Sequence, residues 1–287
     1  MPSFDVLEPR SLEEAFSFLD PEDSSVRPIG GGTALMLMMK AQIYKPTRLV
    51  SLRRLNGMFT GIDLRDDGSI FRLGAMTTFA ELEHSPEIGR RLPVIPRTMS
   101  TLANVRVRNV ATVGGNLAHA DPHLDLPPVW LALDAKVKVV GRSGERVMPV
   151  EAIFAGYYET TLANDDLIAE IEVPIREGWR SDYVKITTRA AHDWPALGLA
   201  LSLQFDRRVI KDARLVLSAA VDKPTRLNAA EKELRGADIS DAVLSRVGAA
   251  AASEAAMESD SRGSADYKRH LLRIHLKRAI QNLAGVQ

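Results

Sequence analysis

The chain has 287 residues, is 45% hydrophobic, and balances 37 lysines and arginines against 37 aspartates and glutamates. This zero net charge disfavours a protein that binds nucleic acid or a membrane surface through a basic face. The chain contains no cysteine, which excludes disulfides, thiolate zinc sites and cysteine-ligated iron–sulfur clusters within it. No signal peptide or apolar run of membrane-spanning length is visible, so we expect a cytoplasmic protein.

The first 56 residues predict alternating strands and helices. The expected order is strand, helix, strand, helix, strand, at residues 3–9, 11–20, 26–29, 33–40 and 47–52. Gly30, Gly31 and Gly32 stand where the second strand passes into the second helix. The free amides at the start of a helix bind phosphate well, and glycine lets such a ligand come close. A tight turn without a ligand is the plainer reading of the same three glycines.

Residues 57–176 predict a mixed unit of strands and helices, and a second glycine pair, Gly114 and Gly115, lies within it. Two strands flank a turn at 66–68, and Thr78 with Glu81 has the spacing of a capping box. Helices are further expected at 93–103 and 127–135, and strands at 136–140, 145–150 and 165–175. After about residue 178 we expect three strands within 181–220 and then three helices, at 225–236, 241–257 and 265–285. This last pattern is typical of a separate α+β domain.

The two glycine loops carry a family resemblance when they are read together. "GGGTALMLMMK" and "VRNVATVGGNLAHADPHLDLPPVWLALDAKV" resemble the two FAD-pyrophosphate loops of the flavoprotein subunit of the xanthine dehydrogenase/carbon monoxide dehydrogenase class of molybdenum hydroxylases. The resemblance continues in "GAMTTFAELEHSP", "TTLANDDLIAEIEVP", "YVKITTRAAHDWPA" and "GSADYKRHLLRIHLKRAI", so it covers nearly the whole chain. Its most specific part is the Arg-Asn-x-x-Thr-x-Gly-Gly-Asn stretch that begins at Arg108.

The resemblance implies an α+β fold in three parts. Residues 1–56 and 57–176 would be the two subdomains of an FAD-binding domain of the vanillyl-alcohol-oxidase (PCMH) type. Residues 177–287 would form a small C-terminal domain in which three antiparallel strands pack on three helices. The diphosphate would lie between the two glycine loops, and the isoalloxazine would reach toward the C-terminal domain.

The resemblance also assigns residues to the cofactor. Backbone amides of the first loop would surround the diphosphate, at Ile29, Gly30, Gly31, Gly32, Thr33, Ala34 and Leu35. Hydroxyl, amide and backbone donors would come from the second loop, at Thr112, Gly114, Gly115 and Asn116. Asp125 would accept a hydrogen bond from the cofactor, while Leu102 and Ile168 would lie against it. Lys185 would lie near the flavin, and Trp194 would shield the isoalloxazine.

Three positions depart from the family pattern. His119 and Asp121 replace the usual asparagine and serine of the second loop. Ala34 also stands where many members have a polar residue. Since the contacts with the diphosphate would be mainly from the backbone, we expect these changes to alter the potential or access of the flavin and not to abolish FAD binding.

The function that the resemblance implies is electron transfer through non-covalently bound FAD. This chain would be the medium subunit of a heterotrimer. A large molybdopterin subunit would oxidise the substrate, and a small subunit with two [2Fe–2S] clusters would pass electrons to the flavin. The flavin would reduce NAD⁺, a quinone, O₂ or another acceptor, with no acid–base residue of this chain as catalyst. The absence of cysteine fits clusters that belong to a partner.

Other readings stay open at this stage. The chain could be a non-catalytic assembly or regulatory homologue that has lost FAD, or a stand-alone flavin oxidase. The H-x-D-x-H-x-D pattern at 119–125 suits a metal site only weakly, because Pro122 breaks the strand that would align it, and we predict no bound metal. Trp194 could be a core aromatic, and the methionines at 36–39 are assigned to core packing. The basic positions of the last helix would form a solvated face or a partner-binding stripe, at Lys268, Arg269, Arg273, Lys277 and Arg278.

Overall fold

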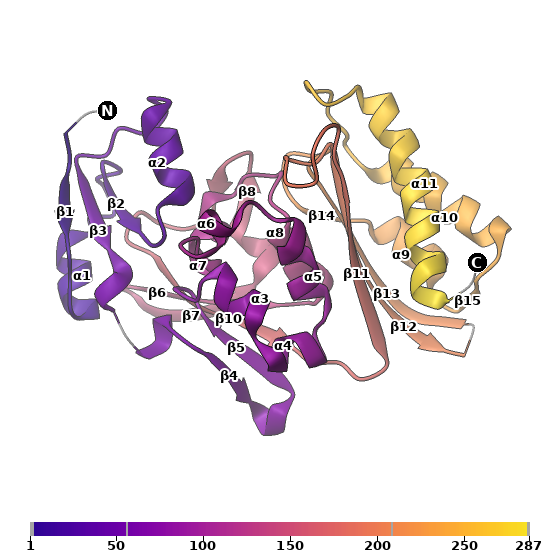
Figure 1. Cartoon of the computed structure of the whole chain (residues 1–287), viewed down its shortest axis with the longest axis horizontal. Coiled ribbons are helices and arrows are strands. Elements are labelled where there is room, and N and C mark those ends of the chain that lie inside the picture. Colours follow the sequence, from indigo (N-terminus) through magenta and orange to yellow (C-terminus); the bar gives the residue numbers. More distant parts are fainter. Residues whose placement is uncertain (1–2, 56, 208, 286–287) are drawn as a thin grey trace.

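The N-terminal part is a small parallel sheet with two helices. The computed structural model describes residues 3–55, 57–207 and 209–285, and this sheet lies at one end of the molecule (Figure 1). Its strands are β1 (Asp5–Leu7), β2 (Val26–Ile29) and β3 (Arg48–Ser51), arranged in the order β1-β3-β2. The helices are α1 (Leu12–Phe18) and α2 (Thr33–Lys40). The predicted succession of strands and helices is confirmed.

The middle part is an antiparallel sheet of five strands with short helices beside it. In the order β4-β5-β10-β6-β7, its strands are Ile62–Arg65, Ile70–Gly74, Leu167–Pro174, Lys136–Gly141 and Gly144–Pro149. The helices, α3 to α8, are Phe79–His84, Pro86–Arg91, Val94–Thr101, Val105–Arg108, Val113–His119 and Leu126–Ala132. Thr78 and Glu81 form the predicted capping box of α3. A small hairpin of β8 (Phe154–Gly156) and β9 (Glu159–Thr160) was not expected from the sequence.

The C-terminal part has three long antiparallel strands and three helices, as predicted. The strands are β11 (Trp179–Ile186), β12 (Leu197–Asp206) and β13 (Val209–Ser218). The helices are α9 (Asn228–Leu234), α10 (Asp241–Glu254) and α11 (Ala265–Ala284). Two short strands, β14 (Thr225–Arg226) and β15 (Ala237–Asp238), add to β13. The α+β fold class is therefore confirmed, whereas the exact division at residues 56 and 176 stays a prediction.

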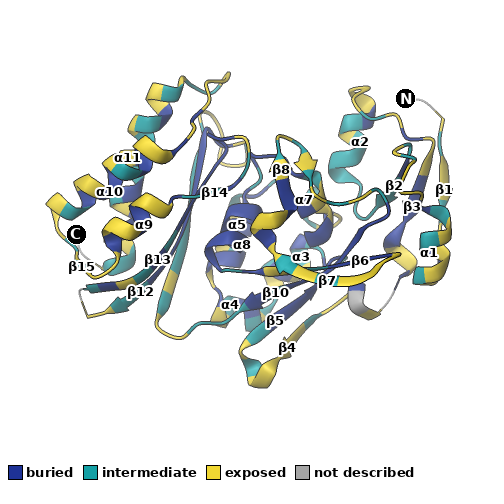
Figure 2. Ribbon diagram, turned by 180° about the vertical axis from the view of Figure 1, so that it is seen from behind, coloured by how far each residue is buried: buried dark blue, intermediate teal, exposed yellow. Residues whose placement is uncertain are grey.

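The central strand of the C-terminal sheet, β12, is buried on both faces (Figure 2). Its leucines, among them Leu199 and Leu201, join the core beneath α9, α10 and α11. The alternate positions hold small residues, and Ala200 belongs instead to the core formed mainly by residues 15–173. Because side chains alternate across a strand, these small residues let α8 pack on the second face of the sheet. One sheet therefore serves two cores.

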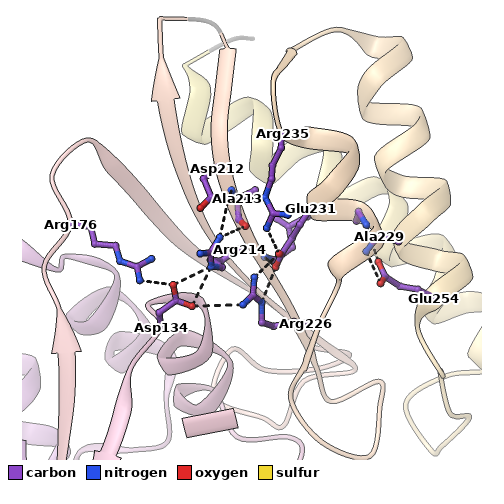
Figure 3. Close-up of polar contacts among 12 residues, drawn as sticks. Asp134, Arg176, Asp212, Ala213, Arg214, Arg226, Ala229, Glu231, Arg235 and Glu254 are labelled. Carbon is purple, nitrogen blue, oxygen red and sulfur yellow. Dashed lines mark hydrogen bonds and ion pairs between the residues drawn. The ribbon is translucent and has the colours of Figure 1, made fainter. Parts of the chain in front are cut away.

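An ion-pair network reinforces this junction (Figure 3). Asp134, just after α8, lies 2.5 Å from Arg176, 3.1 Å from Arg214 and 3.8 Å from Arg226. Arg226 also pairs at 2.5 Å with Glu231, whose side chain is fully buried. Arg214 and Arg226 belong to β13 and to the short strand Thr225–Arg226, so these partly exposed ion pairs join the end of α8 to the C-terminal sheet.

Two details of the fold correct or limit the sequence analysis. The methionines of α2 are not core residues as a group, because Met39 is buried whereas Met36 and Met38 are only half-buried and Leu37 is 63% exposed. The helix has one small sheet to pack on, so most of its apolar side chains remain partly accessible. Among the described residues, no helix combines the length and the apolarity that crossing a membrane requires.

Candidate functional site

The two glycine loops lie against each other. A Cβ at Gly31 would stand 2.0 Å from the carbonyl oxygen of Val110, and one at Gly30 would stand 2.9 Å from Oγ1 of Thr112. Gly32, the N-cap of α2, has a left-handed backbone with φ of 72°, which glycine adopts at little cost. The first two glycines therefore permit the approach of the loops, and the third permits the turn into the helix.

The first loop presents backbone amides that no described residue satisfies. Within the described residues, none of the amides from Gly31 through Leu35 donates a hydrogen bond, and Met36 is the first to do so, to the carbonyl of Gly32 at 3.0 Å. Unsatisfied amides at a helix start carry the positive end of the helix dipole. The geometry suits an anionic ligand such as a diphosphate.

The second loop uses its amides internally. The amide of Val113 donates to the carbonyl of Thr77 at 3.0 Å, and that of Gly114 donates to the carbonyl of Ala75 at 2.8 Å. A Cβ at Gly114 would stand 2.5 Å from the Cβ of Ala75. This glycine therefore lets α7 pack on the turn that follows β5, and its amide is not free for a ligand.

Thr112 and Asn116 supply what the second loop offers to a ligand. Thr112 is the N-cap of α7, and its hydroxyl oxygen accepts the amide of Gly115 at 3.2 Å. The amide of Asn116 donates to the carbonyl of Thr112 at 2.9 Å. Oδ1 of Asn116 is buried and has no hydrogen-bond partner in the described part of the chain. Since buried polar atoms are nearly always paired, this side chain suits a polar ligand group that completes it.

A second group of predicted residues meets at the junction of α5, α8 and β11. Nζ of Lys185 donates to Oδ2 of Asp125 at 2.9 Å and to the carbonyl of Thr101 at 3.1 Å. Leu102 follows directly and is buried. Lys185 thereby reaches the residue that precedes Leu102, 84 positions earlier in the chain, and the contact of both side chains with a flavin stays a prediction.

Asp125 already has an internal donor on each oxygen. Oδ1 accepts the hydroxyl of Tyr183 at 2.7 Å, while Oδ2 accepts Lys185. Burial raises the pKa of Asp125, which the Lys185 ammonium and the Tyr183 hydroxyl oppose. Burial also raises the pKa of Tyr183 well above its ordinary value, with Asp125 adding to the effect, so this phenol stays a donor. A direct hydrogen bond from the cofactor to Asp125 stays a prediction; in the structure, Asp125 orients Lys185.

Tyr183 is a site residue that the sequence analysis missed. It precedes Lys185 by two positions on β11, and side chains two apart share one face of a strand. The spacing of two residues from Lys185 could therefore have indicated that Tyr183 lies on the same face. Ile168, by contrast, was expected at the site, and it lies buried in β10 beside a register irregularity between Ile168 and Glu170; its contact with the cofactor stays a prediction.

Trp194 is exposed, so the alternative of a core aromatic is wrong. The side chain is 49% exposed and lies in the connection between β11 and β12. Its ring stacks on His123, with centroids 5.5 Å apart and planes 14° apart. A hollow of about 690 Å³ opens beside it, lined by Thr188, Arg189, His192, Asp193, Trp194, Ser261 and Arg262. An exposed indole beside open space suits a cover for a planar ring.

The His-rich stretch of the second loop forms hydrogen bonds and no metal cluster. Oδ1 of Asp121 accepts the amide of His123 at 2.9 Å and lies 2.9 Å from its Nδ1. Although burial raises the pKa of Asp121, these bonds lower it below its ordinary value. Burial lowers the pKa of His119, which Asp121 opposes. Among the described residues, no group of three or more histidines and carboxylates is arranged to hold a metal ion.

One residue of the predicted basic face is placed differently. Lys268 is buried, not solvated, and its Nζ lies 3.0 Å from Oδ2 of Asp260. The side chain points toward the loop that precedes α11, because that loop supplies a carboxylate for its charge. For Lys268, both predicted roles, solvated face and partner stripe, are therefore wrong.

The open amides of the first loop, the orphaned oxygen of Asn116 and the two cores that meet at β12 suit a protein that binds an anionic nucleotide cofactor. Residues 2–176 match the family described as the FAD binding domain in molybdopterin dehydrogenase. Residues 182–283 match the C-terminal domain of the CO dehydrogenase flavoprotein. The chain belongs to this family of flavoproteins, and it contains the FAD-binding domain of an oxidoreductase.

Relatives match over almost their whole length. The carbon monoxide dehydrogenase medium chain of Hydrogenophaga pseudoflava is 30% identical over 97% of this chain and 96% of its own. The glyceraldehyde dehydrogenase medium chain of Sulfolobus acidocaldarius is 28% identical over 99% of both chains. A solved structure of carbon monoxide dehydrogenase from Hydrogenophaga pseudoflava has a TM-score of 0.92 and 31% identity, over 99% of this chain and 97% of that one.

Proposed function

We propose that this chain is the FAD-binding electron-transfer subunit of a molybdenum hydroxylase complex. The observation that carries the proposal is the row of unsatisfied amides from Gly31 through Leu35 beside the second loop. The family membership of residues 2–176 supports it. When bound, FAD would supply electron transfer in one-electron or two-electron steps, which this chain's own side chains cannot perform.

The residues would divide the work of holding the cofactor. The amides of the first loop would bind the diphosphate, with Ile29 and Gly30 leading into the turn. Thr112 would add a hydroxyl donor and Oδ1 of Asn116 would accept a hydrogen bond from the cofactor, while Gly114 and Gly115 keep α7 close enough for them to reach. Leu102 and Ile168 would form apolar walls, and the charge of Lys185 would lie near the flavin. Trp194 would cover the isoalloxazine and exclude water from it.

The partners would carry the remaining redox groups. Relatives bear the names medium chain and medium subunit, so we infer a heterotrimer with a small [2Fe–2S] subunit and a large molybdopterin subunit. Electrons would pass from the clusters of the small subunit through this chain to an external acceptor. We further propose a cytoplasmic location, and domain boundaries near residues 56 and 176.

The test is FAD retention by the full chain. The purified chain is mixed with FAD and desalted, and the visible flavin absorption bands are recorded for the wild type and for the Gly31→Glu/Gly114→Glu double variant. We expect the bands to persist in the wild type and to disappear in the variant. Gly89→Ala is the control, because a Cβ at Gly89, within α4, meets no atom within 4 Å, and it should retain FAD.

If the isolated chain retains no FAD, the same measurement with co-expressed partner subunits distinguishes a site that the partners complete from a chain that does not bind FAD. A chain that retains FAD only within the complex would have a site completed by its partners. If the chain retains no flavin in either form, the proposed function is wrong, and the non-catalytic homologue becomes the better interpretation.

A further inference from the structure

A cavity where the middle and C-terminal parts meet has no role in the proposed function. Its volume is about 370 Å³, and residues of α4 and α5 line it from the middle part while residues of β11 and α11 line it from the C-terminal part. Sites that bind small molecules usually have volumes of about 300–1,000 Å³. The cavity is therefore large enough for a compact ligand that would contact both parts of the molecule.

The charged side chains that line this cavity are all cations. Among the described residues of the lining there is no aspartate or glutamate, and the cations are Arg91, Arg97, Arg176 and Arg180. Because the whole chain has equal numbers of acidic and basic residues, the imbalance is local. A guanidinium group presents several N–H donors in one plane, which match the oxygens of a carboxylate or a phosphate. The lining therefore favours an anion.

Two of these arginines are held mainly by backbone carbonyls. Arg97 donates to the carbonyl oxygen of Ser181 at 2.8 Å, and Arg180 donates to that of Leu283 at 2.8 Å. A carboxylate oxygen of Asp182 lies 3.6 Å from Arg97, whereas Arg180 forms no ion pair among the described residues. A carbonyl fixes the position of a guanidinium group without neutralising it, so much of this positive charge is available to a ligand.

The other two arginines have carboxylate partners outside the lining. Glu87 lies 3.7 Å from Arg91, and Asp134 lies 2.5 Å from Arg176 (Figure 3). Asp134 is also shared with two further arginines. Arg97 and Arg180 are therefore the cations best suited to bind an anion, and the other two add to the positive potential of the cavity.

The remainder of the lining is mostly apolar. It consists largely of leucines and prolines, together with Val94 and the indole of Trp179. The guanidinium groups of Arg176 and Arg214 lie 5.1 Å and 5.5 Å from the centroid of this indole, and such cation–π contacts help to fix its position. An apolar ligand body would therefore meet a fixed apolar wall beside the arginines.

We propose that this cavity binds a small organic anion. Its carboxylate or phosphate would lie at the guanidinium groups of Arg97 and Arg180, and its compact apolar body would lie beside Val94 and Trp179. Such a ligand would hold α5 against β11, which already pack side by side (Figure 1). A carboxylate of a partner chain has the same chemistry, but a hollow lined by four separate elements favours a free molecule. The site does not depend on the proposed function.

Calorimetric titration of the full chain without FAD tests the proposal. The probe is 2-naphthoate, because it joins one carboxylate to a flat apolar body, and 2-naphthamide is its uncharged counterpart of similar shape. A low-salt buffer without phosphate or sulfate limits screening and competition by other anions. We expect one molecule of 2-naphthoate to bind per chain, and the amide to bind about tenfold more weakly or less tightly still.

Charge-removing variants locate the binding. Arg97→Gln/Arg180→Gln should weaken 2-naphthoate binding by about tenfold or more and leave binding of the amide unchanged. Arg90→Gln/Arg269→Gln is the matched control, because it removes the same charge from α4 and α11 at positions outside the lining, and it should bind like the wild type. Arg180→Gln is the milder second variant, and thermal unfolding without ligand checks that each variant is folded.

Three results would overturn the proposal: no binding of 2-naphthoate, equal binding of acid and amide, or wild-type binding by folded Arg97→Gln/Arg180→Gln and Arg180→Gln. The titration is then repeated on the complex with co-expressed partner subunits. Unchanged binding supports a site for a free molecule. Loss of binding in the complex would mean that a partner segment fills the cavity, and would also overturn the proposal. FAD retention is measured separately, so either result leaves the proposed function standing.

Discussion

The two glycine loops look alike in sequence and differ in what their backbones do. From Gly31 through Leu35 the amides have no acceptor among the described residues, whereas those of Val113 and Gly114 donate to carbonyls near the end of β5. Both loops need glycine for close approach, since a Cβ at Gly31 or Gly114 would overlap a neighbour. The first loop therefore leaves its amides open to a ligand, and the second is the support against which it packs.

This difference shows that a glycine motif does not by itself identify the groups that bind a ligand. In the first loop the Cα hydrogens of Gly30 and Gly31 that a Cβ would replace face the second loop. The amides that follow are left without an acceptor and are available to an anion. In the second loop the same residue type lets a helix dock on a turn, and the ligand must be bound by side chains. Substitutions in the two loops should therefore differ in how much they lower the free energy of unfolding and how much they lower FAD affinity.

Gly31→Ala should have the largest effect. Its Cβ would stand 2.0 Å from a backbone oxygen of Val110, and a backbone atom cannot rotate away. We expect a loss of about 3 kcal/mol in the free energy of unfolding and a fall in FAD affinity of about 100-fold, equivalent to about 2.7 kcal/mol. Urea unfolding and FAD titration measure the two, with Gly89→Ala as the control. Wild-type behaviour of Gly31→Ala would mean that the loops need not touch.

Gly114→Ala should lower stability more than it lowers affinity. The added Cβ would overlap that of Ala75 at 2.5 Å, at an expected cost of about 2 kcal/mol in the free energy of unfolding. The double variant Gly114→Ala/Ala75→Gly removes the overlapping methyl group and should recover most of that stability. If the double variant is no more stable than Gly114→Ala alone, the contact with Ala75 is not the cause.

Asn116→Ala should show the reverse pattern. Because Oδ1 of Asn116 has no partner among the described residues, its loss should change the free energy of unfolding of the FAD-free protein by less than about 1 kcal/mol. FAD affinity should fall about tenfold, which corresponds to roughly 1.4 kcal/mol. Calorimetric titration of FAD into both proteins measures this. An unchanged affinity would remove Asn116 from the site.

Thr112→Val should have the smallest effect. It removes the hydroxyl that caps α7 through the amide of Gly115, at a cost of about 1 kcal/mol in the free energy of unfolding. Thr112→Ser retains the hydroxyl and should stay close to the wild type in thermal unfolding. If Thr112→Val is as stable as the wild type while Thr112→Ser is not, the methyl group of Thr112 matters and the cap does not.

Local features of this site could be predicted from the sequence, and its long-range partners could not. The turn at Gly30–Gly32 and the capping box of Thr78 and Glu81 depend on residues within a few positions, so periodicity and spacing indicate them. The acceptors for the second loop, such as Ala75, come from a turn that lies 39 positions before Gly114. Only the folded chain shows which amides they satisfy.

Burial of polar side chains by distant partners could not be predicted from the sequence either. Lys268 reads as one of several cations on a helix, and only the loop containing Asp260 makes it a buried ion pair. Tyr183 reads as an ordinary strand residue until Asp125 is placed beside it. In both cases the informative partner lies on another element, where no pattern along the chain connects the two residues.

The sheet that serves two cores has a consequence for how the protein unfolds. Because β12 buries leucines under α11 on one side and small residues against α8 on the other, neither half can melt without uncovering an apolar face of the other. Thermal denaturation of the full chain should then be a single cooperative calorimetric transition. The three-part division of the chain describes its architecture and does not define independently melting units.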